Sequence, residues 1–155
     1  MNSQNIIHET LTFERISTSP IERVYAAFAD IDERVRWGAP SDNTALSYDE
    51  ADFREGGIDV FRCGSKSNPQ YLGVTTYHDI VPNQRIVSSE VVQANGIKLM
   101  VSLSTTTFAA EAEGTRSRVT TQVTAFGGHD MIRGTKAGTN ASLDNLVRIL
   151  KQNYI

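Results

Sequence analysis

The chain has 155 residues and a mass of 17.1 kDa, which is a usual length for one domain. Apolar residues make up 39% of it, enough for a buried core, while a net charge of −3 excludes the strongly basic composition of most nucleic-acid-binding proteins. Its only cysteine, Cys63, cannot form an intramolecular disulfide, as is usual in a reducing compartment. We therefore expect a single domain over residues 1–155, with its core over about 6–152 and no nucleic-acid partner.

Membrane-spanning and secretory segments are not expected either. No stretch approaches the roughly 20 apolar residues that a membrane-spanning helix needs. Residues 1–5 contain no basic residue and are not followed by the long apolar run of a secretion signal. We therefore expect a cytoplasmic protein without membrane insertion.

The first elements in chain order are a strand and two short helices. Residues 6–18 mix β-branched and apolar residues with polar ones, which predicts a strand. Ser19 is suited to cap a helix and Pro20 to occupy its first position, so a helix is predicted to follow. A second helix, near residues 32–37, is predicted to end at Gly38. The apolar residues of the first helix repeat at helical spacing: Ile21, Val24, Tyr25 and Phe28.

The middle of the chain, residues 46–126, has an apolar period of two that is interrupted by turn residues. Asn95-Gly96, between two apolar pairs, is a strong signal for a β-hairpin. Strands joined by short turns form an antiparallel sheet with one buried and one solvent-exposed face. Six further strands are predicted, near residues 46–53, 58–63, 71–81, 85–93, 98–108 and 118–126.

The last segment returns to helical spacing, and its side chains change in size along the chain. Its C-terminal half carries a stripe of large apolar residues: Leu143, Leu146, Val147, Leu150 and Tyr154. The same stripe, extended backward, meets small or mixed residues: Ser142, Thr139, Gly138, Thr135 and Met131. Where such a helix crosses a curved sheet, small residues permit either close backbone approach or a ligand-sized void. The sequence leaves both alternatives open.

Three segments near the start of the chain resemble START-like helix-grip proteins of the SRPBCC superfamily: residues 11–16 (LTFERI), 19–28 (SPIERVYAAF) and 37–40 (WGAP). Two later segments are similar to the branch named after the activator of heat-shock-protein-90 ATPase homologue: residues 52–57 (DFREGG) and 77–87 (YHDIVPNQRIV). Each motif is moderately specific, and it is their order and spacing together that make the resemblance persuasive.

The terminal segment matches this branch as well, through Gly134, Gly138 and the LDNL of residues 143–146. It departs from the branch at Gly138-Thr139, where a Gly-Trp pair is frequent, a change that would widen the cavity entrance or alter what fills it. The resemblance implies an α+β helix-grip fold. In that fold, a curved seven-stranded antiparallel sheet, two short helices and a long C-terminal helix enclose a cavity.

The resemblance implies three alternatives for function. Members of the superfamily carry lipids or hormones, cyclise or dehydrate polyketides, or act as co-chaperone modules, so the fold alone fixes no activity. We predict that the cavity binds a hydrophobic or amphipathic small molecule. The alternatives are a cyclase, dehydratase or hydrolase that uses the same cavity, and a co-chaperone-like interaction module with a chaperone as partner. A homodimer is compatible with the superfamily, but no residue of the chain argues for one.

The cavity lining is predicted from strand alternation and helix spacing. Asp59, Phe61 and Cys63 share one face of their strand, and the family pattern after the double glycine favours that face as the inner one. Asp59 is then either a polar anchor in the cavity or a solvated carboxylate, and its place near the strand end favours the solvated alternative. The other predicted lining residues are Trp37, Tyr48, Phe53, Tyr71, Tyr77, Met100, Met131, Thr135 and Gly138.

Two features of this lining stay open at the level of sequence. Ordinary core packing accounts for each large aromatic residue as well as a pocket wall does. Met100 shares a strand face with Ser102 and Ser104, and a register shift of one residue would exchange that face with the opposite one.

Residue types that metal binding or catalysis needs are present but are not arranged for it. The two His-Asp pairs, at residues 78–79 and 129–130, lack the spacing of helical metal ligands, so neither a metal nor a cofactor is expected. Cys63 is expected to be a small buried residue, and the chain has no Gly-x-Ser-x-Gly motif. The pair that would support cyclase or dehydratase chemistry is Asp59 with Tyr77.

Overall fold

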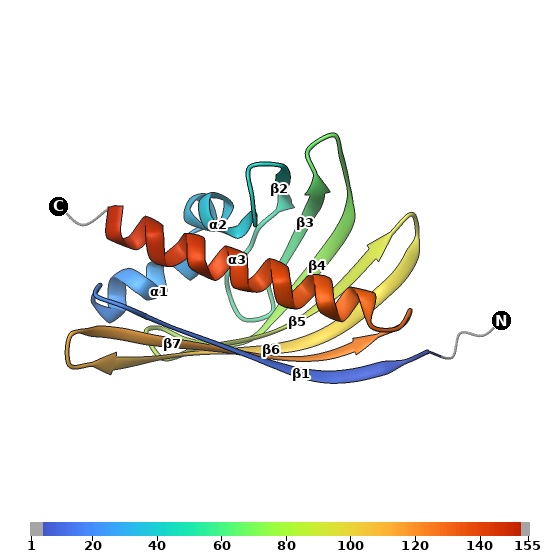
Figure 1. Cartoon of the computed structure of the whole chain (residues 1–155). Coiled ribbons are helices and arrows are strands. Elements are labelled where there is room, and N and C mark those ends of the chain that lie inside the picture. Colours follow the sequence, from blue (N-terminus) through green and yellow to red (C-terminus); the bar gives the residue numbers. More distant parts are fainter. Residues whose placement is uncertain (1–4, 153–155) are drawn as a thin grey trace.

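The computed structural model describes residues 5–152, and its seven strands and three helices confirm the predicted α+β helix-grip fold (Figure 1). The strands form one antiparallel sheet in the order β1-β7-β6-β5-β4-β3-β2. The elements are β1 (Ile7–Ser17), α1 (Ile21–Ala29), α2 (Ile31–Gly38), β2 (Thr44–Glu50), β3 (Ile58–Ser65), β4 (Asn68–Val81), β5 (Arg85–Ala94), β6 (Ile97–Glu111), β7 (Gly114–Ala125) and α3 (Asp130–Gln152).

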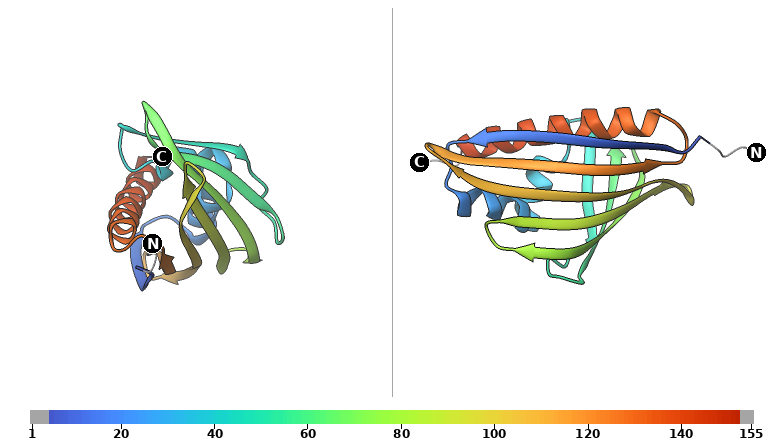
Figure 2. Two further views of the ribbon diagram at one scale, coloured as in Figure 1. Left: turned by 90° about the vertical axis from the view of Figure 1, so that its right-hand side faces the viewer. Right: turned by 90° about the horizontal axis from the view of Figure 1, so that it is seen from below.

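The sheet is strongly curved and wraps around α3, which crosses its concave side (Figures 1 and 2). Tight turns let the long strands follow one another directly. Asn95 and Gly96 both have positive φ, 53° and 78°, as the predicted two-residue hairpin between β5 and β6 requires. Helices α1 and α2 lie at the end of the sheet where the C-terminal half of α3 packs (Figure 1). One end of the concave side is therefore covered by three helices and the other by a single one.

Helix α3 is anchored through its C-terminal half. The large apolar side chains of this half are buried in the core: Leu143, Leu146, Ile149 and Leu150. Ser142 Oγ donates to the carbonyl oxygen of Gly38 at 2.7 Å, and Asn145 Nδ2 donates to that of Ala39 at 2.9 Å, which ties the helix to the end of α2. Tyr154, the last member of the predicted stripe, lies outside the described residues. No helix within residues 5–152 combines the length and hydrophobicity that crossing a membrane requires.

The start of α1 differs from the prediction. Pro20, not Ser19, is the N-cap residue, and no side chain caps the helix. Ser19 is buried instead, with its backbone N–H donated to Ser17 Oγ at 3.3 Å and its carbonyl accepting from Thr115 Oγ1 at 2.8 Å. The predicted Ser19 cap is therefore wrong, because the residue is held between the ends of β1 and β7.

Strand β2 is shorter than predicted. It ends at Glu50 after a register shift beyond Tyr48, so Phe53 lies in the loop that follows it. The backbone N–H of Asp52, also in this loop, donates to Asp59 Oδ1 at 3.0 Å. A side chain of β3 thus accepts a backbone hydrogen bond from the loop that follows β2.

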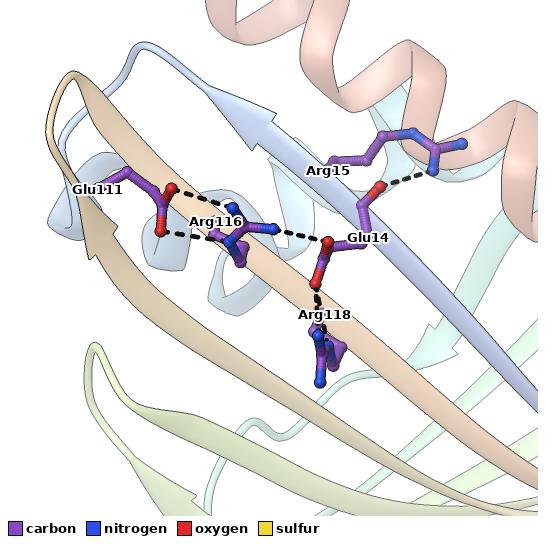
Figure 3. Close-up of polar contacts among 5 residues, drawn as sticks. All are labelled: Glu14, Arg15, Glu111, Arg116 and Arg118. Atoms are coloured by element: carbon purple, nitrogen blue, oxygen red, sulfur yellow. Dashed lines mark hydrogen bonds and ion pairs between the residues drawn. The ribbon is translucent and has the colours of Figure 1, made fainter.

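An ion-pair network joins β1, β6 and β7 (Figure 3). Glu14 accepts from Arg116 at 2.7 Å and from Arg118 at 2.8 Å. Arg116 also donates twice to Glu111, at 3.1 and 3.2 Å. Arg15, whose side chain extends toward α3, donates to the backbone carbonyl of Glu14 at 2.9 Å. The hydrogen bond from Arg118 and the charges of both arginines lower the pKa of Glu14 from its ordinary value.

We expect the substitution Glu14→Gln to lower stability slightly at neutral pH and to have no effect in strong acid. A carboxylate whose pKa is lowered by folding stabilises the fold above its ordinary pKa, and the contribution is lost as the pH falls through the folded-state value. Urea unfolding at a series of pH values measures this, with Glu9→Gln on the same strand as the control. A Glu14→Gln effect that persists unchanged in acid would contradict the assignment.

Candidate functional site

A cavity of about 600 Å³ lies between the inner face of the sheet, α2 and α3. Its wall is built mainly from aromatic and aliphatic side chains, with a minority of hydroxyl, thiol, carboxyl and guanidinium groups. Every residue predicted from the sequence to line a cavity is found in this wall: Trp37, Tyr48, Phe53, Asp59, Phe61, Cys63, Tyr71, Tyr77, Met100, Met131, Thr135 and Gly138.

The small residues of α3 face open space. A Cβ atom built on Gly134 would have no heavy atom within 4 Å, and one built on Gly138 would meet only Pro40 Cγ, at 3.7 Å. Both glycines line the cavity. Of the two alternatives left open by the sequence, close backbone approach is therefore wrong at these positions: Gly138 borders the cavity, and Gly134 lies where the cavity meets solvent.

The face of β6 that lines the cavity is the one that carries Met100 and Ser104. Met100 is 4% exposed, whereas Leu103 on the opposite face is 41% exposed. Hydroxyl groups therefore occupy inner positions at which sequence patterning alone would place apolar residues. One of these inner hydroxyl groups, Ser104 Oγ on β6, forms a hydrogen bond of 3.0 Å with Thr121 Oγ1 on the neighbouring strand β7.

Asp59 is the most deeply buried charged residue of the wall, with 1% of its surface exposed. Its Oδ2 accepts from Tyr77 Oη at 2.5 Å and from Arg34 Nη1 at 2.6 Å, and Oδ1 accepts from the backbone of Asp52. The favoured prediction of a solvated carboxylate is wrong, because the loop after β2 and helix α2 both close over this end of β3. Four elements or loops meet at this one carboxylate.

Arg34 is the neighbour of Asp59 that the sequence did not indicate. It lies on α2, and its side chain is 11% exposed. Besides the ion pair with Asp59, its Nη1 donates to Tyr77 Oη at 2.7 Å, and its guanidinium group lies 5.1 Å from the ring centre of Tyr48. The only available signal was the need of a buried aspartate for a cation, and that signal depended on knowing that Asp59 is buried.

Asp59 and Tyr77, the pair predicted as an acid–base couple, are hydrogen-bonded to each other, and both also bind Arg34. Burial, and to a lesser degree the hydrogen bond to Asp59, raise the pKa of Tyr77 far above its ordinary value. The phenol therefore stays protonated and donates to Asp59. Burial likewise raises the pKa of Tyr48 to about 12, so this second phenol is neutral at physiological pH.

Aromatic rings continue the wall on both sides of this cluster. Phe53 packs edge-on against Tyr77 with ring centres 4.9 Å apart, and Trp37 packs against Phe28 at 5.1 Å. Phe61 on β3 covers Gly73 on β4. A Cβ atom at position 73 would lie 2.0 Å from Phe61 Cζ, so the ring rests directly on the bare backbone of the neighbouring strand.

Glu90 on β5 is a second carboxyl group of the wall and was not predicted from the sequence. It is half-buried, lines the cavity and accepts one hydrogen bond, from Thr75 Oγ1 at 3.2 Å. Burial raises its pKa, and the charge of Asp59 raises it further. Cys63 lies nearby, and burial raises the pKa of its thiol to about 11, which leaves it protonated and a poor nucleophile.

Of the two His-Asp pairs, only Asp130 borders the cavity. His78 Nε2 lies 2.8 Å from Ser89 Oγ, and Asp79 pairs with Arg85 at 2.5 Å. Asp130, at the start of α3, pairs with Arg133. Within residues 5–152, no three histidine, cysteine or acidic side chains gather in a way that would hold a metal ion.

The family model described as "Activator of Hsp90 ATPase homolog 1-like protein" matches residues 18–151. The chain belongs to this family. The match confirms the resemblance to this branch of the START-like superfamily, whose motifs are distributed along the same part of the chain.

Solved structures agree with this membership in the family of Hsp90 ATPase activator homologues. A protein from Rhizobium leguminosarum is 31% identical, with 96% of this chain and 97% of that chain covered and a TM-score of 0.86. The Mll3558 protein from Rhizobium loti is 34% identical over 92% of this chain and 97% of that chain, with a TM-score of 0.81. An AHSA1-like protein from Aeromonas hydrophila, 23% identical with 93% of both chains covered and a TM-score of 0.72, shares the fold. The comparison with curated proteins finds no match.

Proposed function

We propose that the protein binds one hydrophobic or amphipathic small molecule in the cavity between the sheet and α3. The observation that carries this proposal is the void of about 600 Å³ beside Gly134 and Gly138. Ligand pockets of roughly 300–1,000 Å³ are typical, and they are usually apolar with a few placed polar groups. The aromatic wall with its hydroxyl and carboxyl groups has this composition.

The protein carries its own reporter for the test. Trp37, the single tryptophan of the sequence, lines the cavity. A neutral apolar fluorophore such as N-phenylnaphthylamine, bound there, is expected to accept excitation energy from Trp37 and to saturate at one molecule per chain. Native mass spectrometry of protein purified from its own host is expected to show a retained small molecule that unfolding releases. Absence of both saturable fluorophore binding and retained mass would contradict the proposal.

The enzymatic alternative is supported by one observation, the raised pKa of Glu90 in the cavity wall. A carboxyl group whose pKa is raised by burial in a cavity wall is a candidate general acid, which dehydration or cyclisation would require. Its test is to compare the molecules retained by the wild type and by Glu90→Gln when both are produced in the same host. Molecules that differ by one water would support catalysis, and identical molecules would contradict it.

The co-chaperone-like alternative stays a prediction from the family. Among residues 5–152, the exposed large apolar side chains are four: Ile6 just before β1, Ile16 near the end of β1, and Ile97 and Leu103 on β6. An interaction surface usually shows a contiguous apolar patch. The rate of ATP hydrolysis by a purified chaperone, with and without this protein, measures that activity directly.

A further inference from the structure

The charged groups of the cavity wall do not balance one another. Its acidic members are Asp59, Glu90 and Asp130, and its single basic member is Arg34. Arg34 is bound to Asp59, and Asp130 pairs with Arg133 in solvent at the start of α3. Glu90 forms no ion pair with any residue of the described chain. One carboxyl group inside the cavity is therefore left without a cation.

The geometry of Glu90 directs this group at the cavity. Every second residue of β5 faces inward, and four of them line the cavity: Ile86, Ser88, Glu90 and Val92. Thr75 Oγ1 donates to one carboxyl oxygen of Glu90. Within residues 5–152 the other oxygen, Oε2, accepts no hydrogen bond, and Arg34 Nε is the only fully buried side-chain polar atom that lacks a partner. Glu90 Oε2 therefore keeps accessible surface in the cavity and is free to accept a hydrogen bond from a bound molecule.

A carboxyl group in such surroundings is most stable beside a positive charge. Burial of a carboxylate costs free energy unless a cation or several hydrogen-bond donors compensate it. The raised pKa of Glu90 reflects this cost, with burial as the main cause and the charge of Asp59 as a further one. The phenol of Tyr48 and the thiol of Cys63, which are influenced electrostatically by Glu90, are both neutral at physiological pH and supply no charge.

The surroundings also suit a cation in other ways. Aromatic rings attract positive charge through their faces, and Tyr48 already does so for the guanidinium group of Arg34. Phe61 and Tyr71 line the same cavity. A hydrogen bond between an ammonium group and a carboxylate is stronger than one between neutral groups, especially away from bulk water.

We propose that the ligand of this cavity is an amphipathic amine, whose ammonium group binds Glu90 and whose apolar part lies among the aromatic side chains and under α3. This inference rests on the proposed function, and it adds the sign of the headgroup charge. An anionic headgroup of the same size, such as a fatty acid carboxylate, would face Glu90 and be repelled. The cavity therefore distinguishes molecules that have the same alkyl chain but headgroups of different charge.

The test uses decylammonium, decanol and decanoate, which share an alkyl chain and differ in headgroup, as competitors of the neutral fluorophore. The wild type is expected to bind decylammonium at least about tenfold more tightly than decanol, and decanoate more weakly than either. Glu90→Gln is expected to lose most of the preference for decylammonium and to keep its affinity for decanol. Glu50→Gln, an exposed position on β2 with the same change in charge, is expected to behave like the wild type.

The outcomes separate this inference from the proposed function. Equal binding of all three competitors, or an unchanged preference in Glu90→Gln, would overturn the ammonium assignment while ligand binding stands. Failure of the wild type to bind the fluorophore at all would overturn both. The order of the three headgroups is measured on the wild type, so the inference stays testable even if Glu90→Gln does not fold.

Discussion

Replacement of Asp59 by alanine is expected to lower the free energy of unfolding by about 3–5 kcal/mol, because it leaves the Arg34 guanidinium buried without its partner. The side chains of Arg34 and Asp59 are 11% and 2% exposed, so water screens this pair little. The substitution also frees the hydroxyl of Tyr77 and the backbone N–H of Asp52. Urea unfolding at neutral pH measures the change.

Two comparisons make this prediction specific. Asp49→Ala removes the exposed pair with Arg62 between β2 and β3, and its cost is expected to stay below about 1 kcal/mol. The double variant Arg34→Met, Asp59→Ala removes both charges and is expected to be more stable than Asp59→Ala alone, since no buried charge is left unpaired. Equal costs for Asp59→Ala and Asp49→Ala would show that the Arg34–Asp59 pair is not desolvated.

Filling the space beside α3 is expected to weaken binding of the fluorophore strongly without loss of stability. In Gly138→Phe the ring would enter the space where a Cβ atom meets only Pro40, at 3.7 Å. Phenylalanine is also a better helix former than glycine, by a few tenths of a kcal/mol or more. We expect the affinity for the fluorophore to fall by at least about tenfold, which corresponds to about 1.4 kcal/mol. Energy transfer from Trp37 measures it, since this variant adds no second tryptophan.

The matched control places the same ring outside the cavity. Leu103→Phe adds it on the opposite face of β6, where Leu103 is 41% exposed, and binding is expected to stay at the wild-type level. If Gly138→Phe instead costs the 1–3 kcal/mol that is typical of overpacking, the space beside α3 is already filled. If it binds the fluorophore as well as the wild type does, the ligand occupies some other site.

Much of the fold could be predicted because it follows from local patterns. The period-two segments, the Asn95-Gly96 turn and the apolar stripe of α3 each specify their element without reference to the rest of the chain. The family motifs then supplied the way in which these elements are assembled. Errors arose where a tertiary contact overrides a local preference, as at Ser19, whose backbone groups are bound by the ends of two strands.

The site was predicted less completely, for a physical reason. Alternation along β3 identified Asp59, Phe61 and Cys63 as one face, but whether a carboxylate on that face is solvated depends on what covers it. Arg34, which pairs with Asp59, lies on a helix 25 positions earlier in the chain. No local sequence pattern indicates a contact between residues so far apart. Glu90 was missed for the same reason, since a lone glutamate in a strand is usually exposed.

The contact between Phe61 and Gly73 has a consequence for the size of the cavity. Gly73 is buried beneath the ring and is absent from the cavity wall. Any larger side chain at that position would collide with the ring and displace it, and because Phe61 lines the cavity, the displacement would change the space inside. The space inside the cavity is therefore adjustable at a backbone position that is itself absent from its wall.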